Sequence, residues 1–132
     1  MCKYCNNSIG DKAKILYNTF CSIQCLRKYT KEESLGGSPP NINKSDKGIL
    51  GEHAVIADLI RKGFNVFKAV NRHSPFDLLI EKDDIIMKVE VKTGGRNDKT
   101  GTLYFGSTVN NDFHILAVYD LVTTNVYYIH PF

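Results

Sequence analysis

SPFDLLIEKDDIIMKVEVK, residues 74–92, is the stretch that decides the fold. Residues 77–80 and 85–92 are rich in apolar and β-branched residues, and the EKDD cluster between them has turn chemistry, so the stretch predicts a β-hairpin. Side chains alternate along a strand. One face of the second strand should therefore pack into a core, through Ile85, Met87, Val89 and Val91. The opposite face, toward a cleft or solvent, carries Lys88, Glu90 and Lys92.

Two carboxylates and a lysine of this hairpin form a candidate site. Asp77 starts the first strand and Glu90 lies in the second, so both could converge at one end of the sheet. With the Val91 backbone carbonyl they offer hard oxygen ligands that suit Mg²⁺ or Mn²⁺. Lys92 points the same way as Glu90 and could orient a water or offset charge on a phosphate. Alone the pattern is weak, because a carboxylate two residues before a lysine is expected about once in such a chain and a solvated strand face is the alternative.

A helix precedes the hairpin. The pattern GILGEHAVIADLIRK predicts it over residues 48–62, with Ser45 or Asp46 as the N-cap and Gly63 as the C-terminal cap. At the helical repeat of about 100° per residue, one apolar stripe is expected from Ile49, Ile56, Leu59 and Ile60. Glu52 falls inside this stripe, where a carboxylate is costly unless a cation or a hydrogen-bond donor accompanies it.

This series of segments resembles the PD-(D/E)xK nuclease superfamily. The resemblance rests on GILGE ending at Glu52, KGFNV as the next strand, SPFD ending at Asp77, and VEVK over residues 89–92. DFHILAVYD and NVYYIHP, near the C-terminus, are similar to the closing strands of the group I intron-associated endonuclease branch. Archaeal-type Holliday junction resolvases share the same order of helix and strands.

The resemblance implies an α/β (α+β) fold: a restriction-endonuclease-like mixed central sheet with a flanking N-terminal helix. The cysteines near the N-terminus add a small zinc finger before it. The resemblance also implies that Asp77 and Glu90 are metal ligands, that Lys92 is the catalytic lysine, and that Glu52 touches the metal through water. The expected activity is Mg²⁺- or Mn²⁺-dependent hydrolysis of phosphodiester bonds in DNA, by a homing-endonuclease-like or junction-resolving enzyme.

Four cysteines form the second strong pattern. The pairs Cys2-x2-Cys5 and Cys21-x3-Cys25 contain all the cysteines of the chain. Such paired spacing suits tetrahedral Zn²⁺, and the second pair resembles small fingers that read FCSxxC. Disulfides and free thiols are the alternatives, and the lack of a secretory context favours zinc over disulfides. So short a segment would need the metal in order to fold.

Three parts of the chain are expected. Residues 1–33 should form the zinc finger and residues 48–132 the nuclease domain. Residues 34–47, SLGGSPPNINKSDK, are rich in Gly, Ser, Pro and Asn and predict a flexible linker, so that the finger moves relative to the sheet domain. The finger would contact either DNA phosphates or another protein.

Composition bounds the remaining possibilities. With 132 residues, 42% of them hydrophobic, the chain can build one modest core, and a net charge of +3 neither demands nor excludes nucleic acid. No run is apolar enough for a membrane helix or a signal peptide, so a soluble cytoplasmic protein is expected. Loop residues are the candidates for DNA contacts, with plain solvation as the alternative: Arg72, His73, Arg96 and Lys99.

Two further expectations concern partners. A DNA duplex or junction presents two strands and one chain offers one site, so a homodimer or larger homo-oligomer is expected. The competing hypothesis is a non-catalytic nucleic-acid-binding or scaffold protein that uses the finger. The cluster of carboxylates argues against it, because such groups repel one another unless a cation binds. Whether a defined duplex site, a junction or an RNA is cut stays open.

Overall fold

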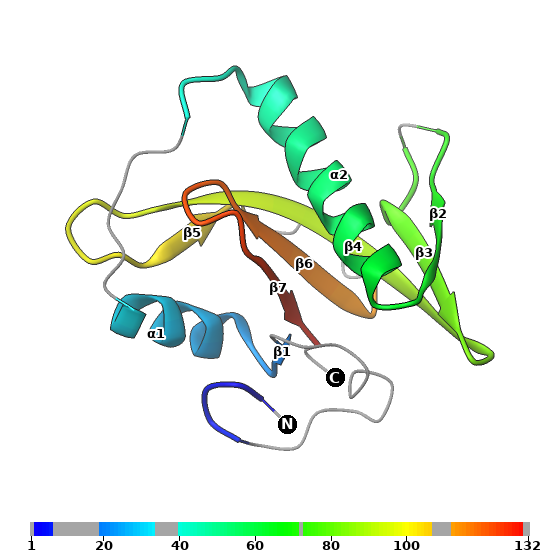
Figure 1. The fold of residues 1–132 in the computed structure, drawn as a ribbon, viewed down its shortest axis with the longest axis horizontal. Coiled ribbons are helices and arrows are strands. Elements are labelled where there is room, and N and C mark those ends of the chain that lie inside the picture. The colour runs from blue at the N-terminus through cyan, green and yellow to red at the C-terminus, as the bar shows by residue number, and fades with distance from the viewer. Residues whose placement is uncertain (1, 7–18, 34–39, 72, 107–111, 131–132) are drawn as a thin grey trace.

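The structure, a computed structural model, describes residues 2–6, 19–33, 40–71, 73–106 and 112–130. Within these ranges the chain forms one seven-stranded sheet with two helices (Figure 1). The strands are β1 (Thr19–Phe20), β2 (Asn65–Lys68), β3 (Leu78–Lys82), β4 (Ile85–Arg96), β5 (Leu103–Phe105), β6 (Ile115–Asp120) and β7 (Val126–Ile129). The helices are α1 (Ile23–Glu33) and α2 (Lys44–Arg61). Neither of these two helices is long and apolar enough to cross a membrane.

The sheet mixes parallel and antiparallel pairing. Its strand order is β1-β7-β6-β4-β3-β2, and β5 pairs with the end of β4. The pairs β4–β6 and β1–β7 are parallel, whereas the other pairs are antiparallel. The second strand of the predicted hairpin therefore lies in the middle of the sheet. This architecture confirms the predicted α/β (α+β) fold with a mixed central sheet.

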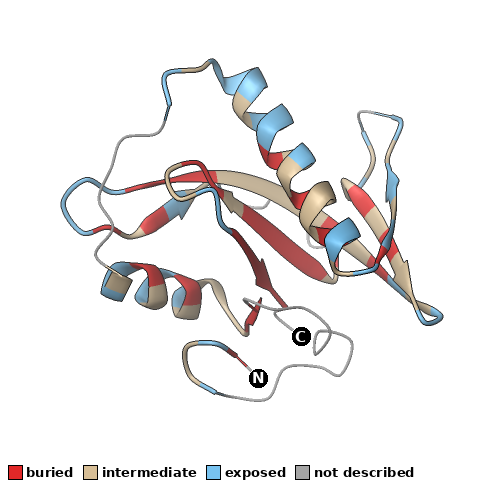
Figure 2. Ribbon diagram, in the orientation of Figure 1, coloured by how far each residue is buried: buried red, intermediate tan, exposed pale blue. Residues whose placement is uncertain are grey.

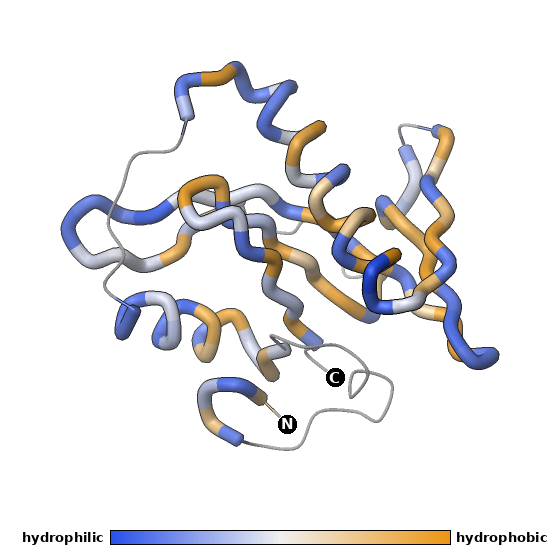
Figure 3. The backbone as a smooth tube through the Cα atoms, viewed as in Figure 1, coloured by the Kyte–Doolittle hydropathy of each residue, from blue (hydrophilic) through white to orange (hydrophobic). Residues whose placement is uncertain are grey.

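The predicted hairpin is formed by β3 and β4. Lys82 is opposite Ile85, so Asp83 and Asp84 make a two-residue turn. Their φ angles of 52° and 65° are left-handed, as both central positions of a type I′ turn require. The tip of the hairpin is hydrophilic, whereas β6 is hydrophobic along much of its length (Figure 3). β4 continues past its predicted end to Arg96, because β5 pairs with its last residues.

Helix α2 begins earlier than the sequence predicted. Its N-cap is Asn43, whose Oδ1 accepts the backbone N–H of Asp46 at 2.9 Å. The prediction that Ser45 or Asp46 caps the helix is therefore wrong, since both residues lie in the first turn. Gly63 directly follows the capping residue with a φ of 89°, which confirms the predicted glycine at this helix end.

The buried face of α2 also differs from the predicted apolar stripe. The fully buried residues of the helix are Gly51, Val55 and Leu59. Ile49 and Ile60, assigned to the stripe from hydropathy, are 53% and 57% exposed. Gly51 belongs to the buried face because it lies against Thr93 of β4, although glycine has no apolar side chain. Figure 2 shows this buried face as the red turns of α2.

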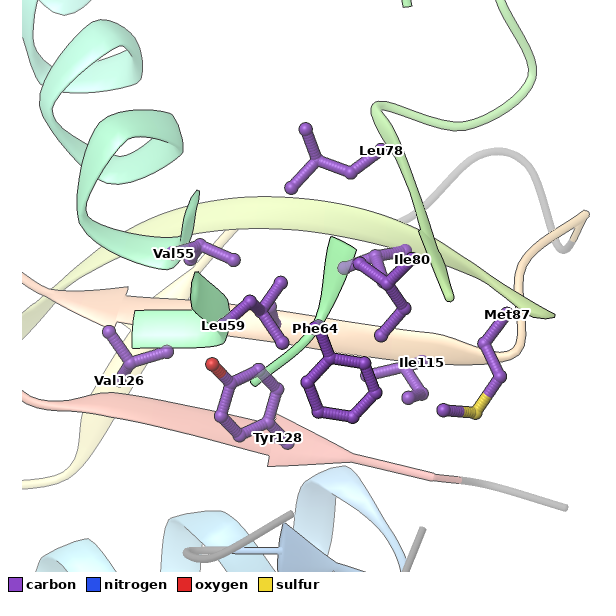
Figure 4. Packing of buried hydrophobic residues seen from close by; sticks show 11 residues of the cluster. Val55, Leu59, Phe64, Leu78, Ile80, Met87, Ile115, Val126 and Tyr128 are labelled. Carbon is purple, nitrogen blue, oxygen red and sulfur yellow. The ribbon is translucent and has the colours of Figure 1, made fainter. Parts of the chain in front are cut away.

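Two hydrophobic cores lie on opposite faces of the sheet, because alternate residues of β6 enter different clusters. Ile115 and Ala117 belong to the first, beneath α2, and Leu116 and Val118 to the second, beneath α1. We call these the α2 core and the α1 core. In Figure 4, Val55 and Leu59 of α2 point toward the strand residues of the α2 core. The buried members of this core are Val55, Leu59, Phe64, Leu78, Ile80, Met87, Val89, Ile115, Ala117, Val126 and Tyr128.

The four-cysteine segment is part of the same sheet and core. β1 pairs in parallel with β7, and α1 packs against β5. The α1 core joins Cys2, Phe20 and Leu26 of this segment to strand residues of the sheet. The expected movement of a separate finger is therefore not supported. Of the predicted linker, residues 34–39 lie outside the described ranges and residues 44–47 belong to α2.

Candidate active site and four-cysteine site

Asp77 lies where β3 leaves its regular pairing with β4. Leu78 is still opposite Val89 in the antiparallel ladder. One residue earlier, the Asp77 N–H donates to the Val89 carbonyl at 3.1 Å. The Asp77 carboxylate Oδ2 accepts the Val91 N–H at 2.8 Å. The side chain of Asp77 thus takes the place of a backbone acceptor and is fixed at the end of the hairpin.

Glu90 lies close enough to Asp77 for the two charges to interact. Burial raises the pKa of the Glu90 carboxyl, the negative charge of Asp77 raises it further, and Lys92 partly opposes this rise. A divalent cation bound by the two carboxylates would offset both unfavourable contributions. The residues present therefore fit Mg²⁺ or Mn²⁺, which prefer carboxylate oxygens.

A cavity of about 690 Å³ opens beside Asp77. Glu52, Val91 and Lys92 also line it, so the structure brings most of the predicted site residues to one place. The lining includes several lysines, which give the cavity a positive potential suited to a phosphodiester backbone. These lysines are Lys44, Lys47, Lys68 and Lys92.

Three of these lysines were missed from the sequence alone. Lys44 and Lys47 precede the predicted start of the helix, and only a helix that begins at Lys44 places them on the same face as Gly51 and Glu52. Lys68 ends β2, two residues beyond the KGFNV segment, and has no assigned role in the family pattern. Extending the helical periodicity by one turn toward the N-terminus would have placed Lys44 and Lys47 in the helix.

Glu52 does not join the other two carboxylates in a compact metal site. Among the described residues, the cysteines alone form a group of three or more candidate ligands whose ligand atoms lie within 4.8 Å of one another. Glu52 lines the cavity together with Asp77, whereas Glu90 is not among the described residues that line it. The Glu52 carboxylate instead forms an ion pair with Lys68, with Oε1 and Nζ 2.9 Å apart.

A close contact fixes α2 against β4 next to Lys92. The Thr93 hydroxyl donates to the Lys47 carbonyl of α2 at 3.2 Å. A Cβ atom added at Gly51 would lie 2.0 Å from the same hydroxyl oxygen, so only glycine fits there. This contact sets the distance between the helix that carries Glu52 and the strand that carries Lys92.

The four predicted DNA contacts have different environments. His73 and Lys99 are exposed, and the backbone of Lys99 donates to the Asn97 side chain. Arg72 lies outside the described residues. Arg96 is buried, and this overturns the prediction that it contacts DNA.

Arg96 is buried because its guanidinium has protein acceptors for all of its N–H groups. Its Nε donates to Asp120 at 2.6 Å in a fully buried ion pair. The other nitrogens donate to four acceptors in α1, β7 and the loop before β5: the carbonyls of Thr30 and Gly101, the Glu33 carboxylate and the Tyr127 hydroxyl. Arg96 thus ties the end of β4 to α1.

The four cysteines come together as the sequence predicted. Their sulfur atoms all lie within 4.8 Å of one another. Cys21 lies 3.6 Å from both Cys5 and Cys25, far longer than the roughly 2.05 Å of a disulfide, and all four cysteines are free. Burial would raise the pKa of the Cys2 thiol, but backbone hydrogen bonds, the strongest from Cys5, outweigh it and lower this pKa to about 6. The cluster could bind zinc.

Comparison with known proteins agrees with this geometry. The model of the PD-(D/E)XK endonuclease family matches residues 42–130, so the chain belongs to this family. The structure is similar to the bacterial homing endonuclease I-Ssp6803I, with a TM-score of 0.60 and 25% sequence identity. That similarity covers 67% of this chain and 65% of the homing endonuclease. A search of curated proteins gave no match.

Proposed function

We propose that this protein is a Mg²⁺- or Mn²⁺-dependent DNA endonuclease. The observation that carries the proposal is the position of Asp77 beside Glu90, at the point where β3 leaves β4, next to a cavity lined by lysines. Membership of the PD-(D/E)XK endonuclease family supports it, since nucleases of this family typically use a divalent metal.

Each residue has a distinct role in the proposed reaction. Asp77, Glu90 and the Val91 carbonyl would hold the metal, which supplies Lewis-acid activation of a water and of the scissile phosphate. Lys92 stabilises the charge that develops on the phosphate in the transition state. Glu52 would touch the metal through water. The Val91 N–H keeps the Asp77 carboxylate oriented throughout, through its hydrogen bond to Oδ2.

The DNA backbone would lie along the lysine-lined cavity. Lys44 and Lys47 are on the first turns of α2, and exposed His73 and Lys99 could extend the contact. Likeness to a homing endonuclease favours cleavage of a duplex at a defined site over resolution of a junction. A substrate with two strands requires two sites, so we propose a homodimer or larger homo-oligomer.

The four-cysteine cluster is proposed to bind Zn²⁺ and to serve a structural role. Thiolates at these distances satisfy tetrahedral zinc, and the backbone donors around Cys2 stabilise negative charge on sulfur. The cluster stabilises the segment that covers the α1 core. Chelation of zinc should therefore unfold α1 and expose Leu26, which circular dichroism and dye binding would detect.

Cleavage assays test the activity. The panel should contain linear duplex, supercoiled plasmid, single-stranded DNA and a four-way junction, each with Mg²⁺ or Mn²⁺. Lys92→Ala should remove cleavage, and Lys28→Ala, an equal change of charge on exposed α1, should not. Cutting of duplex at a defined site supports the homing-like function, and cutting confined to the junction makes the protein a resolvase. Equal cleavage by Lys92→Ala would contradict the proposal.

A further inference from the structure

Among the lysines that line the cavity in the described part of the chain, Lys68 alone has no named role in the proposed reaction. It ends β2, directly opposite Leu78, so its backbone neighbours the residue next to Asp77. Its side chain crosses to α2, where Nζ lies 2.9 Å from Glu52 Oε1. The pair therefore bridges the strand beside Asp77 and the helix that lines the cavity.

The Lys68–Glu52 pair gives the Glu52 carboxylate a cationic partner in the absence of metal. An ammonium group beside a carboxylate competes with any cation for the negative charge of that carboxylate. The ion pair with Glu52 also raises the pKa of Lys68. The Lys68 side chain is 60% exposed, so a ligand entering the cavity can reach it and draw it away.

We propose that Lys68 is a further active-site residue, which holds Glu52 in the metal-free protein and thereby opposes metal binding until DNA enters the cavity. This inference rests on the proposed function. A DNA phosphate gives the ammonium group a second anionic partner, which frees Glu52 for the metal. Binding of DNA and of metal should then favour each other, because such coupling is reciprocal.

The expected size of the effect follows from charge. Removing Lys68 leaves the Glu52 carboxylate without its cation and free to interact with the metal, and the exposure of Lys68 limits the gain through solvent screening. We expect Lys68→Met to bind Mn²⁺ roughly three- to tenfold more tightly than the wild-type protein. Lys68→Arg keeps the ion pair and should leave the affinity unchanged.

The test measures Mn²⁺ affinity by electron paramagnetic resonance, with zinc-loaded protein and no DNA. Lys28→Met is the matched control, because it removes the same charge from an exposed site on α1. The gain from Lys68→Met should vanish in a Glu52→Gln background, since the two residues act as a pair. Affinity of Lys68→Met equal to or weaker than wild type would overturn the inference, and so would a gain that persists without Glu52.

A second measurement tests the coupling to DNA. In the Lys92→Ala background, where DNA is not cut, added duplex should tighten Mn²⁺ binding, and Lys68→Met should remove that effect. If duplex DNA tightens Mn²⁺ binding equally with and without Lys68→Met in this background, the proposed coupling is wrong. Asp77→Asn separates this inference from the proposed function. If Asp77→Asn leaves the Mn²⁺ affinity unchanged, the proposed metal site itself is wrong. If Asp77→Asn weakens Mn²⁺ binding but Lys68→Met does not change it, only the inference about Lys68 is wrong.

Discussion

Strand β4 carries charged side chains in two opposite environments, one in the middle of the strand and one at its end. At Glu90, in mid-strand, burial and the like charge of Asp77 hold the carboxyl in an unfavourable environment that Lys92 only partly offsets. At Arg96, where the strand ends, a buried charge has an acceptor for every donor. The first arrangement leaves interaction energy available for a ligand, and the second stabilises the fold. A buried or half-buried charge therefore indicates a binding site only when its partners are incomplete.

The largest effect on stability should come from breaking the complete network. Arg96→Met leaves Asp120 buried without a cation, and we expect a loss of about 3–5 kcal/mol in the free energy of unfolding. Urea denaturation measures it. Lys99→Met, on an exposed loop of the same region, should change stability by no more than about 0.5 kcal/mol. Equal effects of the two variants would show that the Arg96 contacts contribute nothing to the fold.

Removing a charge from the site around Asp77 and Glu90 should reduce cleavage activity and leave the fold intact. Asp77→Asn keeps an acceptor for the Val91 N–H but removes the charge, so cleavage should fall by roughly 10²–10³-fold or more while the fold is retained. Single-turnover cleavage in Mg²⁺ measures it, with Asp84→Asn in the exposed turn as the control. Full activity of Asp77→Asn would place the metal elsewhere.

The contact between α2 and β4 should give an intermediate effect. Gly51→Ala forces a methyl group into the Thr93 hydroxyl, and overpacking of this kind typically costs about 1–3 kcal/mol. Gly48→Ala, on the same helix with open space around it, should stabilise slightly through helix propensity. Thermal denaturation compares the two variants, and a Gly51→Ala protein as stable as Gly48→Ala would contradict the close approach.

The smallest expected effect is a gain in stability when Glu90 is replaced. The pKa of Glu90 is raised in the folded protein, so the folded state binds its proton more tightly than the unfolded state, and stability falls as pH rises through the range between the two values. Glu90→Gln removes this cost, so in metal-free buffer near pH 7 it should be as stable as the wild type or more stable, by less than about 1 kcal/mol. Urea titrations at pH 4 and pH 7 check the sign, since the difference should shrink at the lower pH. A clear loss of stability at pH 7 would refute the prediction.

Local chemistry made much of the fold predictable. The hairpin follows from alternation and from the aspartates at its turn, and the cysteine cluster follows from spacing. The prediction that Asp77 and Glu90 approach each other rested on the same register. The hairpin and the approach of Asp77 to Glu90 depend on residues near one another in the sequence. The cysteine cluster depends on a metal-ligand pattern whose members must lie close together in space.

The remaining features depend on long-range contacts that carry no local pattern. Arg96 looked like a charged residue of a polar loop, yet its partner Thr30 is 66 positions away. The position of Glu52 was predicted correctly on the helix, but its pairing with Lys68 depends on how β2 is placed beside α2. Hydropathy also misplaced the buried face of α2, because Gly51 contributes contact through its small size and not through apolar surface.

The pairing of β1 with β7 has a consequence for how the chain folds during synthesis. Thr19 lies beside Tyr128, so the α1 core cannot close until β7 has emerged from the ribosome. Until then Phe20 and Leu26 have only part of their final surroundings, and the nascent chain exposes apolar surface to chaperones. Contacts between residues so distant in sequence also raise the contact order, which slows folding. Early metal capture by the four cysteines would protect this segment during that delay.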